Sequence, residues 1–381
     1  VEFIQLGLEY KPLNLGQGLP DDLVPNAVIE ELKNIASDPN PNSVLHQYTR
    51  GFGHPRLVNA LSKLYGDLLG HPLDPMKEVL VTDGAYEALF TSIMGHINPG
   101  DEVIIIEPYF DCYEPKLGLQ EEPRSLSDGC ITSADWKLNP EELSAAFTPQ
   151  TKAIIFNNPN NPLGKVYSRE EIQMHNVLCI SDDVYEHMVF DDNKMIRMAT
   201  IPGMKTFSVT GWKLGWALGP QHLIRNCQIV HQNCVYTCPT PIQEAVARGL
   251  EREMERLESP ECYFKSISRD LQEKRDYIAR VLKDIGMNPV IPEGGYFILA
   301  DWSAFKDKVD LSSETDKRMD YKFVKWLLKN RKLQGIPPSA FFIEDHKHIG
   351  ESFIRLCFIK HNDSLQKAEE ILRKMKRNWH D

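Results

Sequence analysis

Two lysines eight residues apart are candidates for a chemical role in this chain. They bracket the segment Lys205-Thr206-Phe207-Ser208-Val209-Thr210-Gly211-Trp212-Lys213. A lysine in an apolar and aromatic setting can lose its proton and attack a carbonyl carbon. The second, Lys213, could bind a phosphate group as a point charge. Because most lysines are solvated surface residues, either one taken alone could equally be non-functional.

Two polar segments upstream supply further groups. The first, Asn157-Asn158-Pro159-Asn160-Asn161-Pro162-Leu163-Gly164, predicts a rigid turn whose amides could donate to a ligand oxygen, although an ordinary turn would look the same. The second, Ser181-Asp182-Asp183-Val184-Tyr185, places Asp182 after an apolar run. A buried carboxylate is costly unless it is paired, and a protonated pyridine nitrogen would be a suitable partner. The alternative for Asp182 is a helix N-cap.

The elements that must position these groups alternate between strands and helices. Apolar runs predict strands at 79–82, 102–107, 152–157, 177–182 and 213–218, with a helix at 86–96. This alternation indicates an α/β fold with a mainly parallel sheet. Ligands bind at the carboxyl ends of the strands in such sheets, so the polar segments should meet at one edge.

The second half of the chain has a different pattern. An amphipathic helix is expected within 259–286, followed by strands at 296–301 and 353–359, a helix near 321–330 and a charged helix from 365. At about 100–200 residues per domain, 381 residues suggest two domains. We expect a large domain at 42–257 and a smaller α+β domain made of 1–41 and 258–381.

Composition excludes several classes of protein. The net charge of −11 argues against binding to nucleic acid or to anionic membranes, and no apolar run approaches the roughly 20 residues of a membrane span. The eight cysteines are scattered without a C-x-x-C pair, which predicts no metal site and favours a reducing compartment, cytoplasmic or mitochondrial. The chain starts at Val1 rather than Met, so we expect a natural N-terminus upstream.

Taken together and in this order, the polar segments resemble those of the fold-type I pyridoxal-phosphate (PLP) aminotransferases. The nearest resemblance is to kynurenine aminotransferases, also known as glutamine transaminase or cysteine-S-conjugate β-lyase, and it runs nearly end to end. It includes Leu15-Gly16-Gln17-Gly18, Gln47-Tyr48-Thr49-Arg50-Gly51-Phe52-Gly53-His54-Pro55, Phe110-Asp111-Cys112-Tyr113-Glu114-Pro115, His231-Gln232-Asn233 and Gly294-Gly295-Tyr296-Phe297.

The resemblance implies a cofactor site. Lys205 would hold PLP as a Schiff base and move the substrate proton, and Asp182 would pair with the protonated pyridine nitrogen. The remaining cofactor contacts implied are phosphate binding by Ala85, Tyr86 and Lys213, ring stacking by Phe110, and hydrogen bonds to the phenolic oxygen from Asn161 and Tyr185.

The resemblance also implies a substrate site and a homodimer. Arg355 would clamp the substrate carboxylate, with the backbone of Gly18 beside it, although a structural salt bridge is the alternative for Arg355. Tyr236 would face the substrate side chain, unless it serves only core or interface packing. Tyr48 would reach across a dimer interface to the neighbour's phosphate, so the active sites would be shared.

The implied activity is transfer of the amino group of kynurenine, another bulky or aromatic amino acid, or glutamine to a 2-oxo acid, with β-lyase activity where Cβ carries a good leaving group. Three segments, near Gln120, Glu171 and Met204, are shorter than the family pattern, and Pro202 stands where relatives have a phosphate-binding serine. Either the written sequence lacks residues there or the deletions are real; we favour the former, because each edge resumes in register. The alternative function is a catalytically impaired homologue kept as a binding or structural dimer.

Overall fold

The computed structural model describes residues 2–21, 25–39, 42–113, 132–169, 171, 177–197 and 210–377. Lys205 therefore lies outside the described residues, and so do Gln120, Pro202 and Met204 of the shortened segments. Glu171 is described, but its neighbours at 170 and 172–176 are not.

Three parallel strands form the sheet that carries the polar segments. They are β3 (Glu102–Ile105), β4 (Thr151–Asn157) and β5 (Leu178–Asp182), in the order β3-β4-β5. Nearly all their residues are buried, as expected for strands covered on both faces. The register pairs Asn157 at the end of β4 with Asp182 at the end of β5. The predicted parallel α/β arrangement is confirmed, and two of the polar segments begin side by side.

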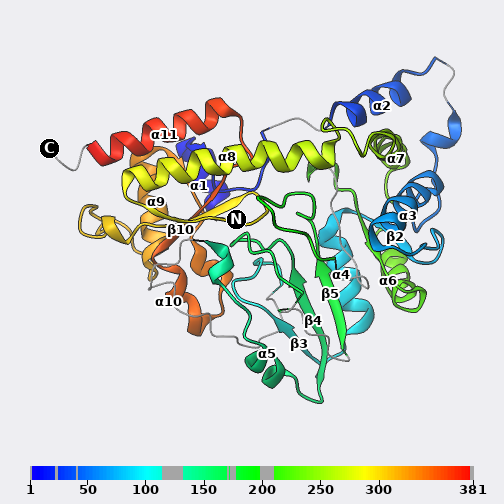
Figure 1. The fold of residues 1–381 in the computed structure, drawn as a ribbon, viewed down its shortest axis with the longest axis horizontal. Coiled ribbons are helices and arrows are strands. Elements are labelled where there is room, and N and C mark those ends of the chain that lie inside the picture. Colours follow the sequence, from blue (N-terminus) through cyan, green and yellow to red (C-terminus); the bar gives the residue numbers. More distant parts are fainter. Residues whose placement is uncertain are drawn as a thin grey trace.

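A second pair of strands holds the lysine segment. Here β2 (Val79–Thr82) runs antiparallel to β6 (Gly215–Leu218), with Thr82 opposite Gly215. Lys213 precedes β6, and α4 (Gly84–His96) begins directly after β2. The pairing therefore brings Lys213 to the start of α4. Helices α2 (Asn26–Ser37), α3 (Pro55–Leu69), α6 (Gln221–Cys234) and α7 (Thr240–Glu255) lie around this pair (Figure 1).

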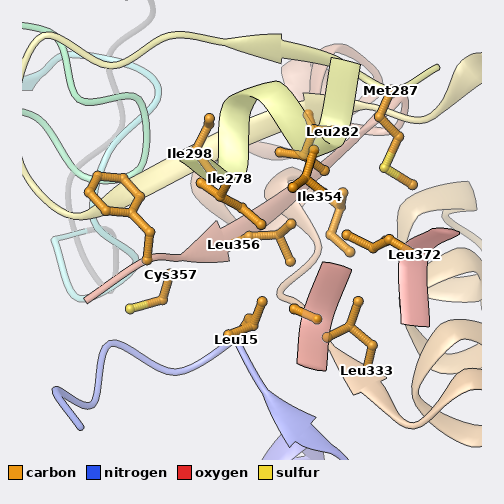
Figure 2. Close-up of a cluster of buried hydrophobic side chains, with 14 of the residues drawn as sticks. Leu15, Ile278, Leu282, Met287, Ile298, Leu333, Ile354, Leu356, Cys357 and Leu372 are labelled. Atoms are coloured by element: carbon orange, nitrogen blue, oxygen red, sulfur yellow. The ribbon is translucent and has the colours of Figure 1, made fainter. Parts of the chain in front are cut away.

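The smaller part of the molecule has its own core. The strands β7 (Asn288–Val290), β8 (Phe297–Asp301) and β10 (Phe353–Cys357) form an antiparallel sheet in the order β10-β8-β7. Helices α8 (Tyr263–Ile285), α9 (Met319–Arg331) and α11 (Asn362–Arg377) pack on it, and α8 and α11 run side by side in Figure 1. Figure 2 shows Leu15, from the N-terminal segment, pointing at Leu356 of β10.

The N-terminal segment is divided between the two cores. Strand β1 (Leu13–Asn14) pairs in parallel with β9 (Leu333–Gln334) of the smaller part. Helix α2, by contrast, packs against α7, and its Val28 belongs to the core around α3 and β2. The domain limits given above stay a prediction. Helix α2 lies in the segment 1–41, which we expected in the smaller domain, but it contacts the larger core. The remaining regular helices described are α1 (Glu2–Tyr10), α5 (Pro140–Ala146) and α10 (Lys347–Gly350).

Helix ends follow local chemistry. The amphipathic helix expected within 259–286 begins at Tyr263 and ends at Ile285. The next residue, Gly286, has a φ of 94°, the left-handed conformation that favours glycine at a helix C-terminus. In the described ranges, no helix is long and apolar enough to cross a membrane. Those same ranges contain no group of three or more His, Cys, Asp or Glu side chains that could hold a metal ion.

Gly215 of β6 packs closely against the backbone at the start of α4. A Cβ at this position would lie 2.5 Å from the carbonyl carbon of Gly84 and 2.6 Å from the amide nitrogen of Ala85. Because backbone atoms cannot turn aside, we expect Gly215→Ala to lower the free energy of unfolding by about 1–3 kcal/mol. Gly211→Ala is the control, since a Cβ there meets nothing within 4 Å and should change stability by less than about 0.5 kcal/mol. Urea unfolding measures both, and equal stability of the two variants would contradict this packing.

Candidate active site

A cavity of about 360 Å³ lies where the segments after β2, β3, β4 and β5 meet the smaller part of the molecule. Nine residues predicted from the sequence line it: Gly18, Ala85, Tyr86, Phe110, Asn161, Asp182, Tyr185, Lys213 and Arg355. The other lining residues are Pro20, Gly84, Leu89, Asn157, Val184, Met188, Tyr296 and Phe297. The prediction that the polar segments meet at one edge is confirmed.

The part of the cavity lining at the start of α4 is suited to an anion. Helix α4 begins there at Gly84, which has a φ of 79°. The Nζ atom of Lys213 lies 3.4 Å from the position that a Cβ on Gly84 would occupy. A helix N-terminus offers unpaired backbone N–H groups and a partial positive charge, and the lysine adds a full one. Glycine at this position leaves the space between the lysine and the helix start open.

A buried carboxylate lines the cavity. Asp182 is 3% exposed, and its Oδ2 atom accepts a hydrogen bond from the Tyr113 hydroxyl at 2.5 Å. The backbone carbonyl of Asp182 accepts from the Asn157 side chain at 2.9 Å and from the Asn158 amide at 3.1 Å. These bonds fix the end of β5, so the carboxylate lines the cavity in a defined place.

A tyrosine and an asparagine also line the cavity. Burial raises the pKa of Tyr185 well above its ordinary value, and the neighbouring Tyr296 and Asp182 add to this effect. The Tyr185 hydroxyl therefore keeps its proton and can donate a hydrogen bond. The Nδ2 atom of Asn161 lies 3.5 Å from the Tyr185 hydroxyl, while its Oδ1 accepts from Arg355 at 2.9 Å. Asn161 thus links the tyrosine to the arginine.

A buried guanidinium also lines the cavity. Arg355 is 6% exposed and lies between two aromatic rings, 4.0 Å from the centre of Phe297 and 4.8 Å from that of Phe341. Its Nη2 donates to the Gly16 carbonyl at 3.0 Å. Burial lowers its pKa. In the described part of the chain, Arg355 forms no ion pair with a carboxylate and its Nε has no hydrogen-bond partner. The alternative of a structural salt bridge therefore has no support there, and the geometry suits an incoming anion.

Two predicted residues lie outside the cavity lining. Tyr48 and Tyr236 are 78% and 55% exposed, and their rings meet edge to face at 5.7 Å. The segments that carry them contact each other, because the Thr240 hydroxyl donates to the Gln47 carbonyl. The role assigned to Tyr48 requires a second chain, and the roles of both tyrosines stay predictions. The role of Lys205 stays a prediction as well.

Several residues of the site were not assigned a role from the sequence. Tyr296 and Phe297 belong to a segment that carried the resemblance, but no role was assigned to them. Tyr113 meets Asp182 from 69 positions away in the chain. Gly84 could have been found as the residue between a strand and a helix, where a close approach to an anion favours glycine.

The sequence profile described as "Aminotransferase class I and II" matches residues 10–371. The chain belongs to this family. The predicted fold-type I aminotransferase architecture is thereby confirmed. Among solved structures, this aminotransferase is similar to Bna3p from Saccharomyces cerevisiae (30% identity, TM-score 0.88, covering 98% of this chain and 95% of the other).

Relatives of this aminotransferase include kynurenine transaminases. The chain is 48% identical to kynurenine–oxoglutarate transaminase 3 of Rattus norvegicus, over 98% of this chain and 87% of the relative. It is 43% identical to kynurenine–oxoglutarate transaminase 1 of Homo sapiens, over 99% and 95%. The first alignment runs over 400 positions, more than the 381 residues of this chain, so the relative carries residues without a counterpart here. The suspected family is confirmed, and nothing in the described residues favours a non-catalytic homologue.

A buried aspartate holds the turn that carries Phe341, one of the two aromatic rings beside Arg355. Phe341 ends the turn η7 (Pro338–Phe341), and within it the Ser339 amide donates to Asp320 Oδ2 at 2.8 Å. The Tyr321 amide donates to the other oxygen at 2.9 Å. Burial raises the pKa of Asp320 to about 6, because these two bonds offset only part of the desolvation.

Asp320 should make stability depend on pH. Its folded pKa lies above the ordinary value of 3.8, so its contribution is fully present below pH 3.8 and is lost as pH rises through 6. We expect the free energy of unfolding to fall in this window by up to about 3 kcal/mol, and Asp320→Asn to flatten the fall. Urea titrations at several pH values measure this, with the exposed Asp307→Asn as control. An unchanged slope in Asp320→Asn would rule out this source of pH dependence.

Proposed function

We propose that this aminotransferase uses pyridoxal 5′-phosphate to transfer the amino group of kynurenine, or of another bulky or aromatic amino acid or glutamine, to a 2-oxo acid. One observation carries the proposal: a single cavity contains an anion site at Lys213 and the start of α4, a buried carboxylate at Asp182, and a buried guanidinium at Arg355. The names of the kynurenine transaminase relatives support the choice of substrate.

The residues present fit the cofactor. The N–H groups of Ala85 and Tyr86, with Lys213, would hold its phosphate, in the space that a Cβ on Gly84 would narrow. Asp182 would pair with the ring nitrogen, and Phe110 would cover one face of the ring. Asn161 and Tyr185 would hydrogen-bond its phenolic oxygen. When bound, PLP supplies the electron sink that stabilises negative charge at the substrate Cα.

The residues of this chain would perform the remaining work. Arg355 would bind the α-carboxylate through two parallel hydrogen bonds, beside the backbone of Gly18, and so fix which bond at Cα faces the cofactor. The amine of Lys205 would attach the cofactor and move the proton from Cα. Tyr296, Phe297 and Met188 would exclude water from this region. With a leaving group on Cβ, the same proton removal leads to β-elimination.

The active site is proposed to be shared within a homodimer. The side chains of Tyr48 and Tyr236 are exposed. Further exposed apolar residues are Tyr86, Phe90 and Met94 on α4, Ile229 on α6 and Val235 directly after α6. A large exposed apolar surface is typical of a protein–protein interface. In a second chain, Tyr48 would reach the neighbour's phosphate and Tyr236 its substrate. The compartment, cytoplasm or mitochondrion, stays a prediction.

The covalent role of Lys205 has a direct spectroscopic test. PLP added to the apoprotein should give a visible absorption band that borohydride reduction makes permanent, because only an imine is reduced to a stable amine. Lys205→Ala should lose both the band and the covalent attachment, whereas the exposed Lys194→Ala should keep them. Covalent PLP on Lys205→Ala, located by peptide mass spectrometry, would assign the role to another lysine.

The role of Arg355 can be separated from cofactor binding. Replacing it with glutamine removes the positive charge that would bind the carboxylate, so we expect KM for kynurenine to rise about 10- to 100-fold. The absorption band of bound PLP should be unchanged. Arg252→Gln, on the exposed side of α7, is the matched control and should leave KM as it is. A normal KM in Arg355→Gln would show that the carboxylate binds elsewhere.

A further inference from the structure

A tyrosine that does not line the cavity is bonded to the carboxylate that does. Tyr113 is 4% exposed and lies in the core of the β3-β4-β5 sheet. Its hydroxyl donates to Asp182 Oδ2 at 2.5 Å, within the range of hydrogen bonds from a hydroxyl to a charged oxygen. Tyr113 would therefore act on a ligand in the cavity only through Asp182.

The direction of this hydrogen bond is fixed. Burial raises the pKa of Tyr113 well above its ordinary value, and the neighbouring charge of Asp182 raises it further. The hydroxyl therefore keeps its proton at neutral pH and acts only as a donor to the carboxylate. A donor to the charged form of an acid favours that form, so Tyr113 stabilises the ionised state of Asp182.

The same turn also shapes the cavity. The Tyr113 amide donates to the Phe110 carbonyl at 3.0 Å, and the two rings meet edge to face with centroids 5.9 Å apart. Phe110 lines the cavity, whereas Tyr113 reaches past it to Asp182. One turn thus supplies an aromatic side chain to the cavity and a hydrogen-bond donor to the carboxylate in it.

We propose that Tyr113 is a positioning residue that keeps Asp182 ionised and oriented toward a cationic ring nitrogen. This inference rests on the proposed use of PLP. The competing explanation is that Tyr113 only fills the core. The two differ in which atoms matter, because core packing needs the ring, whereas positioning needs the hydroxyl.

Tyr113→Phe removes the hydroxyl and keeps the ring, so the fold should be retained. We expect the dissociation constant of PLP from the apoprotein to rise about 10- to 100-fold at pH 7, the effect of losing a hydrogen bond to a charged group. On acidification, the variant should release PLP at a higher pH than the wild type, because the donor that favours the ionised carboxylate is gone. Tyr109→Phe is the control: Tyr109 is buried in the same core and does not line the cavity.

A double-mutant cycle isolates the pair. With Asp182→Ala as background, the hydroxyl has no carboxylate to stabilise, so Tyr113→Phe should change the dissociation constant by less than about threefold. PLP labelled with ¹⁵N in its ring gives a readout independent of affinity: its chemical shift should move toward that of the unprotonated nitrogen in Tyr113→Phe and stay unchanged in Tyr109→Phe.

The outcomes distinguish the two levels of the proposal. Failure of the wild-type protein to bind PLP would overturn the proposed function itself. Normal PLP binding by the wild type with the same affinity, pH profile and ¹⁵N shift in Tyr113→Phe would overturn the positioning role alone. An equal loss of affinity in Tyr109→Phe and Tyr113→Phe would also overturn it, since both would then act through packing.

Discussion

The site depends on the burial of a guanidinium beside neutral partners. A buried charge is normally compensated by an opposite charge, since its desolvation is costly. Arg355 is instead held, within the described residues, by the Gly16 carbonyl, the Asn161 side chain and the faces of two aromatic rings. These partners stabilise the guanidinium without cancelling its charge, so its attraction for an anion is retained in a low-dielectric cavity.

Many elements converge because of this requirement. Gly16 comes from the N-terminal segment, which β1 and β9 tie to the smaller part, and Asn161 comes from the turn after β4. Phe297 begins β8, and Phe341 is placed by a turn whose amide bonds to Asp320. The N-terminal segment and the turn after β4 are far apart in sequence, and both contact the buried Arg355 side chain. The site is therefore complete only when these segments are packed together.

The sequence was informative where burial and chemistry coincide along a short stretch. Apolar runs ending in Asn157 and Asp182 predict strands with polar ends, and the parallel register then brings these ends together. The pairing of β2 with β6 was not predictable, because strand direction and partner depend on contacts between segments more than 130 positions apart. The role of Tyr113 was missed for the same reason, because it depends on a contact with a distant segment. Until the partner of its hydroxyl is known, a buried tyrosine is interpreted as a core residue. Tyr48 illustrates a different point, since its assigned role depends on a second chain and not on contacts within this one.

The charges in the cavity also determine how a ligand can lie in it. The lining combines a positive site at Lys213 and the start of α4, the carboxylate of Asp182 and the guanidinium of Arg355. A ligand with two anionic groups and one cationic group can match these three charges, whereas a ligand group placed against a like charge is costly at low dielectric. A phosphate, a substrate carboxylate and a protonated ring nitrogen supply such a set of charges. Asp182 is the only negative member of the three, so any group that controls its ionisation controls the whole pattern. The hydroxyl of Tyr113 is in direct contact with that carboxylate, and for this reason a residue outside the cavity can influence which ligand the cavity accepts.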